Sequence, residues 1–168
     1  LLITVLAFTT SIYTLQFTDT DGNTVNMSSH QGKKILLVNI ATNSSRVGQL
    51  AGLQQLHQTY GDSIVVIAFP SNSFGHEGRT NAEIKTFCQN NYGVTFKIAA
   101  KNDVIGAGIQ PIYNWLAQSS ENGVMNGTVG NDFQKFLVDK NGNLVGVFAP
   151  SIEPMSAAIT TALTTNYE

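Results

Sequence analysis

The sequence contains few cysteines, few prolines and few charged residues. Of its 168 residues one is a cysteine, Cys88, and four are prolines. A lone cysteine cannot form an intramolecular disulfide, so the cysteine content does not indicate the redox compartment. Charged residues make up 12% of the chain, against about 25% in an average protein, so much of the polar surface comes from Asn, Gln, Ser and Thr. A chain of this length buries roughly 70% of its unfolded surface without a disulfide or a metal.

Positive charge is neither abundant nor clustered. Nine Lys and Arg residues stand against eleven Asp and Glu, and the longest basic run is the pair Lys33-Lys34. A nucleic-acid groove or an anionic membrane patch needs clustered positive charge, so we expect neither as a partner. The three histidines, His30, His57 and His76, have no second ligand type at metal-binding spacing. We therefore expect no metal and no cofactor.

Residues 1–10, "LLITVLAFTT", form a short apolar run. A bilayer span needs about 20 apolar residues, so we expect no membrane insertion. The run is similar to the apolar region of a secretory signal peptide, which would make the protein periplasmic or secreted. As an N-terminal strand of the domain it would leave a cytoplasmic location open, and both interpretations stand at this point.

Strand patterns dominate the first third of the chain. Apolar and polar residues alternate on both sides of Asp21-Gly22, which predicts a β-hairpin with strands at 12–18 and 24–27 and a two-residue turn. Two runs without alternation, "KILLVNIA" and "SIVVIAF", predict strands covered on both faces in a mostly parallel sheet.

Helical spacing of apolar residues predicts the covering helices. They are expected at 48–60, at 81–91, within "QPIYNWLAQ" and after Pro154. "GVTFKIAAK" suggests a short edge strand, residues 118–131 a surface loop, and "KNGN" the turn of a second hairpin. We therefore predict one α/β domain over 11–168, with a central mixed β-sheet, helices on both faces and an N-terminal β-hairpin.

Six separated blocks carry a family likeness. They are "DTDGNTVNMSSHQGKKILLVNIAT", "GLQQLHQTYGD", "VVIAFPSNSFG", "EIKTFCQNNYGVTF", "FQKFLVDKNGNLVGVFAP" and "IEP". In their order and spacing the chain resembles the glutathione peroxidases over about residues 11–163. The resemblance implies a thioredoxin-like fold, thiol-dependent reduction of hydroperoxides in the response to oxidative stress, and a thiol reductant, glutathione or thioredoxin, as partner.

The chain departs from that family at all four catalytic positions. Ser44 stands where the family has cysteine or selenocysteine, Ser73 replaces a glutamine, and Asn131 and Asp132 replace a tryptophan and an asparagine. Peroxide reduction needs a thiolate or selenolate, which a thiol with a pKa near 8.5 can supply. A serine hydroxyl is a far weaker acid and needs an adjacent base. The resemblance therefore implies a peroxidase ancestry, whereas the residues predict that the reaction is lost or strongly impaired.

Other residues offer alternative sites. Cys88 lies where thioredoxin-using members can hold a resolving cysteine, so it is either the nucleophile of a one-cysteine peroxidase or a small buried residue. His76, with Glu77 or Asp132 as the acid, could activate Ser44 in a hydrolase, although no GxSxG motif accompanies it; otherwise it is an exposed loop histidine. The two arginines, Arg46 and Arg79, fall in loops that border the family's pocket. They would hold an anion there or remain solvated.

Overall fold

The computed structural model describes residues 9–167. The predicted signal peptide or strand at residues 1–10 therefore lies almost wholly outside the described residues. Within residues 9–167 no helix is long and apolar enough to cross a membrane.

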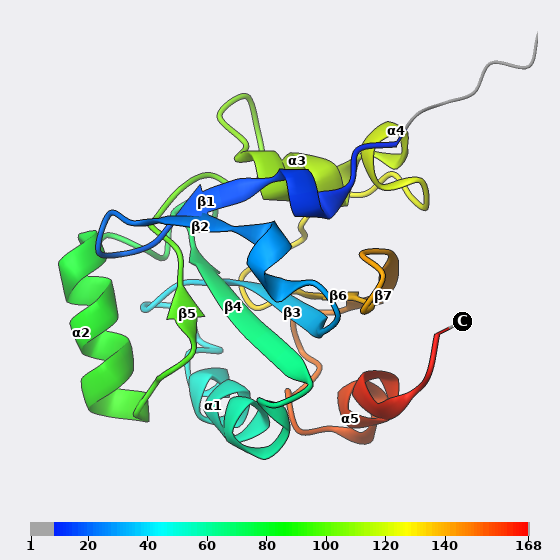
Figure 1. Cartoon of the computed structure of the whole chain (residues 1–168). Helices are drawn as coiled ribbons and strands as arrows, with labels where there is room; N and C mark the ends of the chain where they lie inside the picture. The colour runs from blue at the N-terminus through cyan, green and yellow to red at the C-terminus, as the bar shows by residue number, and fades with distance from the viewer. Residues whose placement is uncertain (1–8, 168) are drawn as a thin grey trace, which may run out of the picture.

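A five-stranded mixed sheet forms the centre of the molecule (Figure 1), in the order β5-β4-β3-β6-β7. Its strands are β3 (Lys34–Ile40), β4 (Ile64–Pro70), β5 (Lys97–Ile98), β6 (Lys135–Val138) and β7 (Leu144–Phe148). β3 runs parallel to β4, and β4 parallel to β5, whereas β6 and β7 are antiparallel. β3 and β4 are almost fully buried, as the apolar runs predicted.

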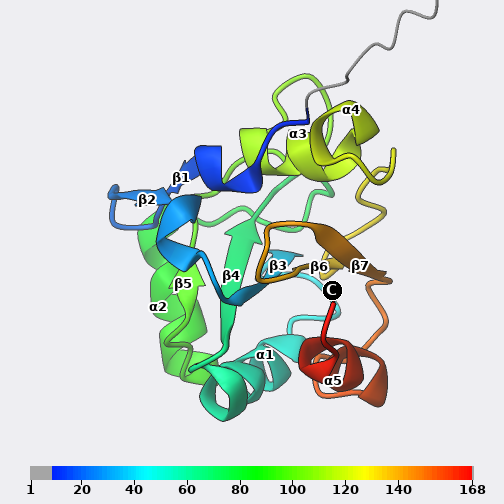
Figure 2. The same cartoon turned by 45° about the vertical axis from the view of Figure 1, so that its right-hand side comes forward.

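Helices cover both faces of the sheet, because alternate residues of a strand point to opposite sides. Leu36 and Val38 face the core under α1 (Gln49–Tyr60), α2 (Asn81–Tyr92) and α5 (Ala157–Thr164). Ile35 and Leu37 face the core under α3 (Pro111–Ala117) and the N-terminal hairpin. Figure 2 shows α1 and α5 together on one side, with α3 and α4 on the other. The predicted α/β architecture is confirmed.

The N-terminal hairpin is shorter than predicted. Its strands are β1 (Gln16–Thr18) and β2 (Thr24–Asn26), and the flanking residues form the short 3-10 helices η1 (Ile12–Thr14) and η2 (Met27–His30). The two-residue turn was wrong: five residues, 19–23, connect the strands. The Asp19 carboxylate holds this connection by accepting the amides of Asp21 and Asn23, each at 2.9 Å. Asp139 organises the second hairpin in the same way, accepting the amides of Asn141 at 2.8 Å and Asn143 at 2.9 Å.

The predicted surface loop at 118–131 contains a short helix, α4 (Ser119–Asn122). The buried Asn122 side chain holds it, donating to the carbonyls of Trp115 and Met125 and accepting the amide of Val124. The last helix begins at Ala157 rather than directly after Pro154. α2 runs one residue beyond its predicted end and stops at Gly93, whose φ of 62° suits glycine.

Candidate functional site

Ser44 lies in the turn that joins β3 to α1. The residue is 4% exposed. Its amide donates to the carbonyl of Ala41 at 3.2 Å, and its hydroxyl oxygen accepts the amide of Arg46 at 3.3 Å. This bond uses the hydroxyl as a local acceptor, in the way that serine commonly stabilises a turn. Within residues 9–167 no hydrogen bond joins Ser44 to His76.

The loop that follows β4 is fastened to the Ser44 loop by Glu77. This carboxylate is fully buried and accepts the amide of Thr42 at 2.7 Å and its hydroxyl at 2.8 Å. The amide of Arg79 donates to it at 3.2 Å, and the amide of Asn43 donates to the carbonyl of His76 at 3.1 Å. Glu77, considered above as the acid of a hydrolase, is thus occupied in joining two loops.

His76 and Asp132 are brought together. Nδ1 of His76 lies 2.5 Å from Oδ2 of Asp132, and the two side chains are 46% and 0% exposed. A buried carboxylate bound to a half-exposed imidazole leaves the other ring nitrogen, Nε2, as the free position of the ring. The second oxygen of Asp132, Oδ1, is buried and has no hydrogen-bond partner among residues 9–167.

Asp132 lies in a strained turn. Phe133, the next residue, has a φ of 67°, and it is the one non-glycine residue with positive φ in the described chain. Its amide donates to the carbonyl of Asn39 at 2.6 Å, while the Asn39 side-chain amide donates to the carbonyl of Asn131 at 3.0 Å. Such a conformation costs about 1–3 kcal/mol and is found most often at functional sites. The turn therefore fixes residues 131–133 against the end of β3.

Ser73 and the two arginines have other contacts. The Ser73 hydroxyl oxygen accepts the Ser71 hydroxyl at 2.8 Å and the amide of Val104 at 3.1 Å. The Arg79 guanidinium donates to the hydroxyl of Thr42 at 2.6 Å and lies 4.6 Å above the ring of Phe87. One terminal nitrogen of Arg79 thus binds the Ser44 loop, and Arg79 stays a predicted ligand for an anion. The guanidinium of Arg46 has no hydrogen bond to another described residue, so Arg46 stays a candidate ligand for an anion.

Lys135, which the sequence did not single out, is fully buried in β6. Its ammonium donates to the side chain of Gln49 at 2.5 Å and to the carbonyls of Ile152 at 2.6 Å and Pro150 at 3.3 Å. Burial lowers its pKa to about 8; Glu153 opposes this shift and Arg46 adds to it. Lys135 ties the first turn of α1 to the segment after β7. The one sequence signal for a buried Lys135 was its position at the start of the otherwise apolar strand "KFLV".

Cys88 lies on the inner face of α2 and is completely buried. Burial raises the pKa of its thiol to about 12; Glu77 adds to the rise and Arg79 opposes it. The thiolate is the reactive form of cysteine. Cys88 thus has the properties of the small core residue that was one of its two predicted roles.

We expect native Cys88 to react with maleimide at least about 100-fold more slowly than Cys88 in the urea-unfolded chain, because burial removes both access and thiolate. Labelling followed by intact mass spectrometry measures the two rates. Comparable rates would show that α2 opens readily and exposes the thiol.

Residues 9–167 contain no group of three or more His, Cys, Asp or Glu side chains that could hold a metal ion.

The family model described as glutathione peroxidase matches residues 12–117. The chain belongs to the glutathione peroxidase family. A glutathione peroxidase of Lactococcus lactis subsp. cremoris is 39% identical over 136 residues, which cover 80% of this chain and 86% of the relative. The glutathione peroxidase-like peroxiredoxin 2 of Saccharomyces cerevisiae is 39% identical over 152 residues, covering 88% and 93%.

Solved structures agree with this membership of the glutathione peroxidase family. The crystal structure of Trgpx in apo form is similar with a TM-score of 0.72 at 28% identity, covering 92% of this chain and 93% of that one. A thioredoxin-family thiol:disulfide interchange protein from Chlorobium tepidum has a TM-score of 0.62 at 16% identity, covering 93% and 97%. The second likeness concerns the fold alone, and it confirms the thioredoxin-like architecture.

Proposed function

We propose that this member of the glutathione peroxidase family has kept the fold and lost the hydroperoxide reductase reaction. The observation that carries the proposal is Ser44 at the position where the family resemblance places the redox nucleophile. The relatives named above are a glutathione peroxidase and a peroxiredoxin, so ancestry alone would favour activity. The side chains present favour its loss.

The chemistry of the hydroxyl supports the proposal. A thiolate attacks a peroxide oxygen and becomes a sulfenic acid, which a second thiol can reduce. A serine hydroxyl ionises far less readily, and within residues 9–167 its one side-chain hydrogen bond comes from an amide donor rather than from a base. Ser44 should therefore neither attack the peroxide nor form a product that glutathione or thioredoxin can reduce.

The remaining family positions support it as well. Ser73 is bound to Ser71 and Val104, and Asp132 is bound to His76. The hydroxyl of Ser73 and one carboxylate oxygen of Asp132 thus have partners within the protein. A site with so many groups changed offers a peroxide neither a nucleophile nor the family's polarising groups.

Hydroperoxide consumption tests the proposal. Purified protein is mixed with hydrogen peroxide or an organic hydroperoxide, together with reduced glutathione or a thioredoxin system. We expect consumption equal to that of the buffer with either reductant. Turnover that disappears in Cys88→Ala would contradict the proposal and assign the reaction to Cys88.

A hydrolase is the second candidate, favoured by the bond between His76 and Asp132. In this candidate the Ser44 oxygen attacks an ester carbonyl, Nε2 of His76 takes the hydroxyl proton and gives it to the leaving alcohol, and water then releases the acyl group. The backbone bond from Asn43 to His76 brings the two loops side by side.

A fluorophosphonate probe and p-nitrophenyl acetate test the hydrolase candidate. It predicts that Ser44→Ala and His76→Ala each lower ester hydrolysis at least about 100-fold, whereas Ser45→Ala, at the exposed neighbouring residue, leaves it unchanged. Equal hydrolysis or equal labelling in wild type and Ser44→Ala would rule the candidate out.

A further inference from the structure

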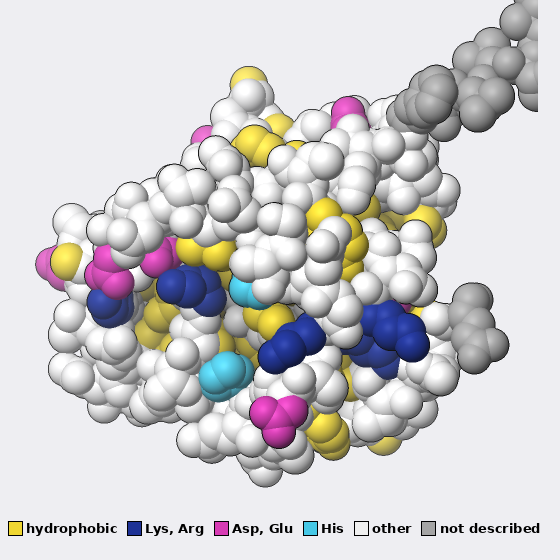
Figure 3. Space-filling model, in the orientation of Figure 1, with side chains coloured by type: hydrophobic (Ala, Val, Ile, Leu, Met, Phe, Trp, Pro, Cys, Tyr) yellow, Lys and Arg dark blue, Asp and Glu magenta, His cyan; other side chains and the backbone are white. Residues whose placement is uncertain are grey.

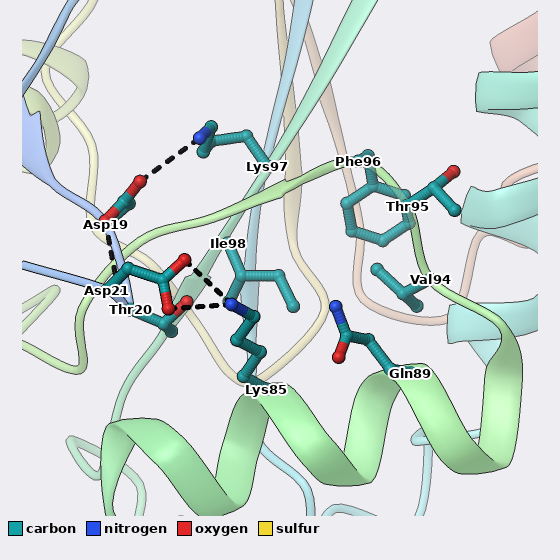
Figure 4. Close-up of a pocket in the computed structure, with 10 residues that line it drawn as sticks. All are labelled: Asp19, Thr20, Asp21, Lys85, Gln89, Val94, Thr95, Phe96, Lys97 and Ile98. Atoms are coloured by element: carbon teal, nitrogen blue, oxygen red, sulfur yellow. Dashed lines mark hydrogen bonds and ion pairs between the residues drawn. The ribbon is translucent and has the colours of Figure 1, made fainter. Parts of the chain in front are cut away.

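A polar cleft lies at the edge of the sheet, between α2, β5 and the turn of the N-terminal hairpin. Its volume is about 170 Å³. Figure 4 shows side chains of Lys85 and Gln89 rising from successive turns of α2, with Lys97 and Asp19 opposite them. None of the residues that line the cleft belongs to the two loops around Ser44.

Charges of both signs stand at the rim. Lys85 Nζ lies 2.7 Å from both carboxylate oxygens of Asp21, and these side chains are 35% and 52% exposed. Lys97 Nζ lies 3.1 Å from Asp19 Oδ2, with the lysine 45% exposed. Figure 3 shows positive and negative side chains gathered side by side on this edge of the molecule. Exposed ion pairs contribute only about 0–1 kcal/mol, so a ligand with its own charges can replace the contact between Lys85 and Asp21 at little cost. The Asp19 side chain is only 4% exposed, and the amides of Asp21 and Asn23 also bind it.

The backbone of the edge strand also faces the cleft. The amide of Ala99 donates to the carbonyl of Ala68 in β4, so alternation turns the peptide group of Ile98 outward. In the hairpin, the amide of Thr20 donates to the Ile98 carbonyl at 3.1 Å. Beyond this contact the hairpin turns away from β5. Phe96 lies at a bend directly before β5 and lines the cleft, and its backbone makes no hydrogen bond to another described residue. This end of the edge strand is therefore open to an extended peptide, which is how such peptides bind sheet edges.

Gln89 adds a free polar group. Its side-chain amide has no hydrogen-bond partner among residues 9–167, and in Figure 4 it points into the space between Lys85 and the segment that leads to β5. An amide both donates and accepts, so it suits a peptide group as partner.

We infer that this cleft binds a short zwitterionic peptide, with its carboxylate at Lys85 and Lys97, its amino group at Asp21, and its backbone along Phe96. The two aspartates would repel a purely anionic ligand, and the two lysines would repel a purely cationic one. A ligand whose two opposite charges are separated by a peptide unit can place its negative charge at the lysines and its positive charge at Asp21. The site is independent of the chemistry at Ser44.

Binding of alanylalanine tests the inference. Nitrogen-labelled protein is titrated with the dipeptide, with its N-acetyl form and with its C-terminal amide, and amide resonances are followed. The dipeptide should shift the Phe96 and Ile98 resonances, and each blocked form should bind at least about fivefold more weakly because it lacks one charge-assisted contact.

Variants provide a second test arm. Lys85→Gln and Asp21→Asn alter partly exposed side chains and should weaken dipeptide binding at least about fivefold, whereas Lys140→Gln, on the exposed second hairpin, should leave it unchanged. Three results would overturn the inference: no shift up to the solubility limit, equal binding of the blocked dipeptides, or equal binding by the Lys85 and Asp21 variants.

Discussion

Glu77→Ala is expected to lower the free energy of unfolding by about 3 kcal/mol, since a buried charged acceptor that bonds several donors contributes about that much when removed. The substitution leaves the amide and hydroxyl of Thr42 and the amide of Arg79 without their acceptor. It also removes the contact that joins the loop after β4 to the Ser44 loop. Both loops would have to rearrange or admit water.

Urea unfolding followed by circular dichroism measures this effect, with Asp62→Ala as the matched control. Asp62 is an exposed carboxylate after α1, and its removal should change stability by less than about 0.5 kcal/mol. A loss below about 1 kcal/mol for Glu77→Ala would mean that the buried carboxylate is not the main link between the loops.

Ser44→Cys alone is expected to restore little peroxidase activity. Its turnover should stay at least about 100-fold below that of the variant that also carries Ser73→Gln, Asn131→Trp and Asp132→Asn, because groups that polarise a nucleophile contribute factors of this size. In the single variant, Asp132 adds a carboxylate where the family has a neutral amide. A nearby negative charge disfavours a thiolate.

The comparison is made in a Cys88→Ala background, so that the new thiol is the one cysteine present. Ser45→Cys is the matched control, because it places a thiol on the exposed neighbouring residue. Turnover by Ser44→Cys equal to that of the fourfold variant would show that the missing sulfur is the chain's one defect.

The spacing of apolar residues along the sequence correctly predicted the main strands and helices. The uninterrupted apolar runs of β3 and β4 and the helical spacing in α1 and α2 led directly to the mixed sheet and its covering helices. The turn of the N-terminal hairpin was mispredicted because the side chain of Asp19 sets its length. α4 was missed because it depends on the contacts of the buried Asn122 rather than on periodicity.

Contacts between residues far apart in the sequence could not be read from local patterns. One of the two interpretations of His76 gave it an acidic partner, Glu77 or Asp132, and in the structure Asp132, 56 positions away, binds it. The hydrogen bond that Thr42 donates to Glu77 spans 35 positions, and the one that Lys135 donates to Gln49 spans 86. Only the folded chain brings such partners together. A buried lysine or glutamate looks in the sequence like any other charged residue.

A single-turnover reaction with hydrogen peroxide tests the central claim most directly, since the first step of the family reaction needs no reductant. Wild-type protein is mixed with one equivalent of peroxide, and the peroxide that remains is measured over time, followed by intact mass spectrometry. The account predicts that peroxide remains at the buffer level and that the mass of the protein does not change. Rapid loss of one equivalent by the wild-type chain would contradict it and show that this protein still reduces peroxide.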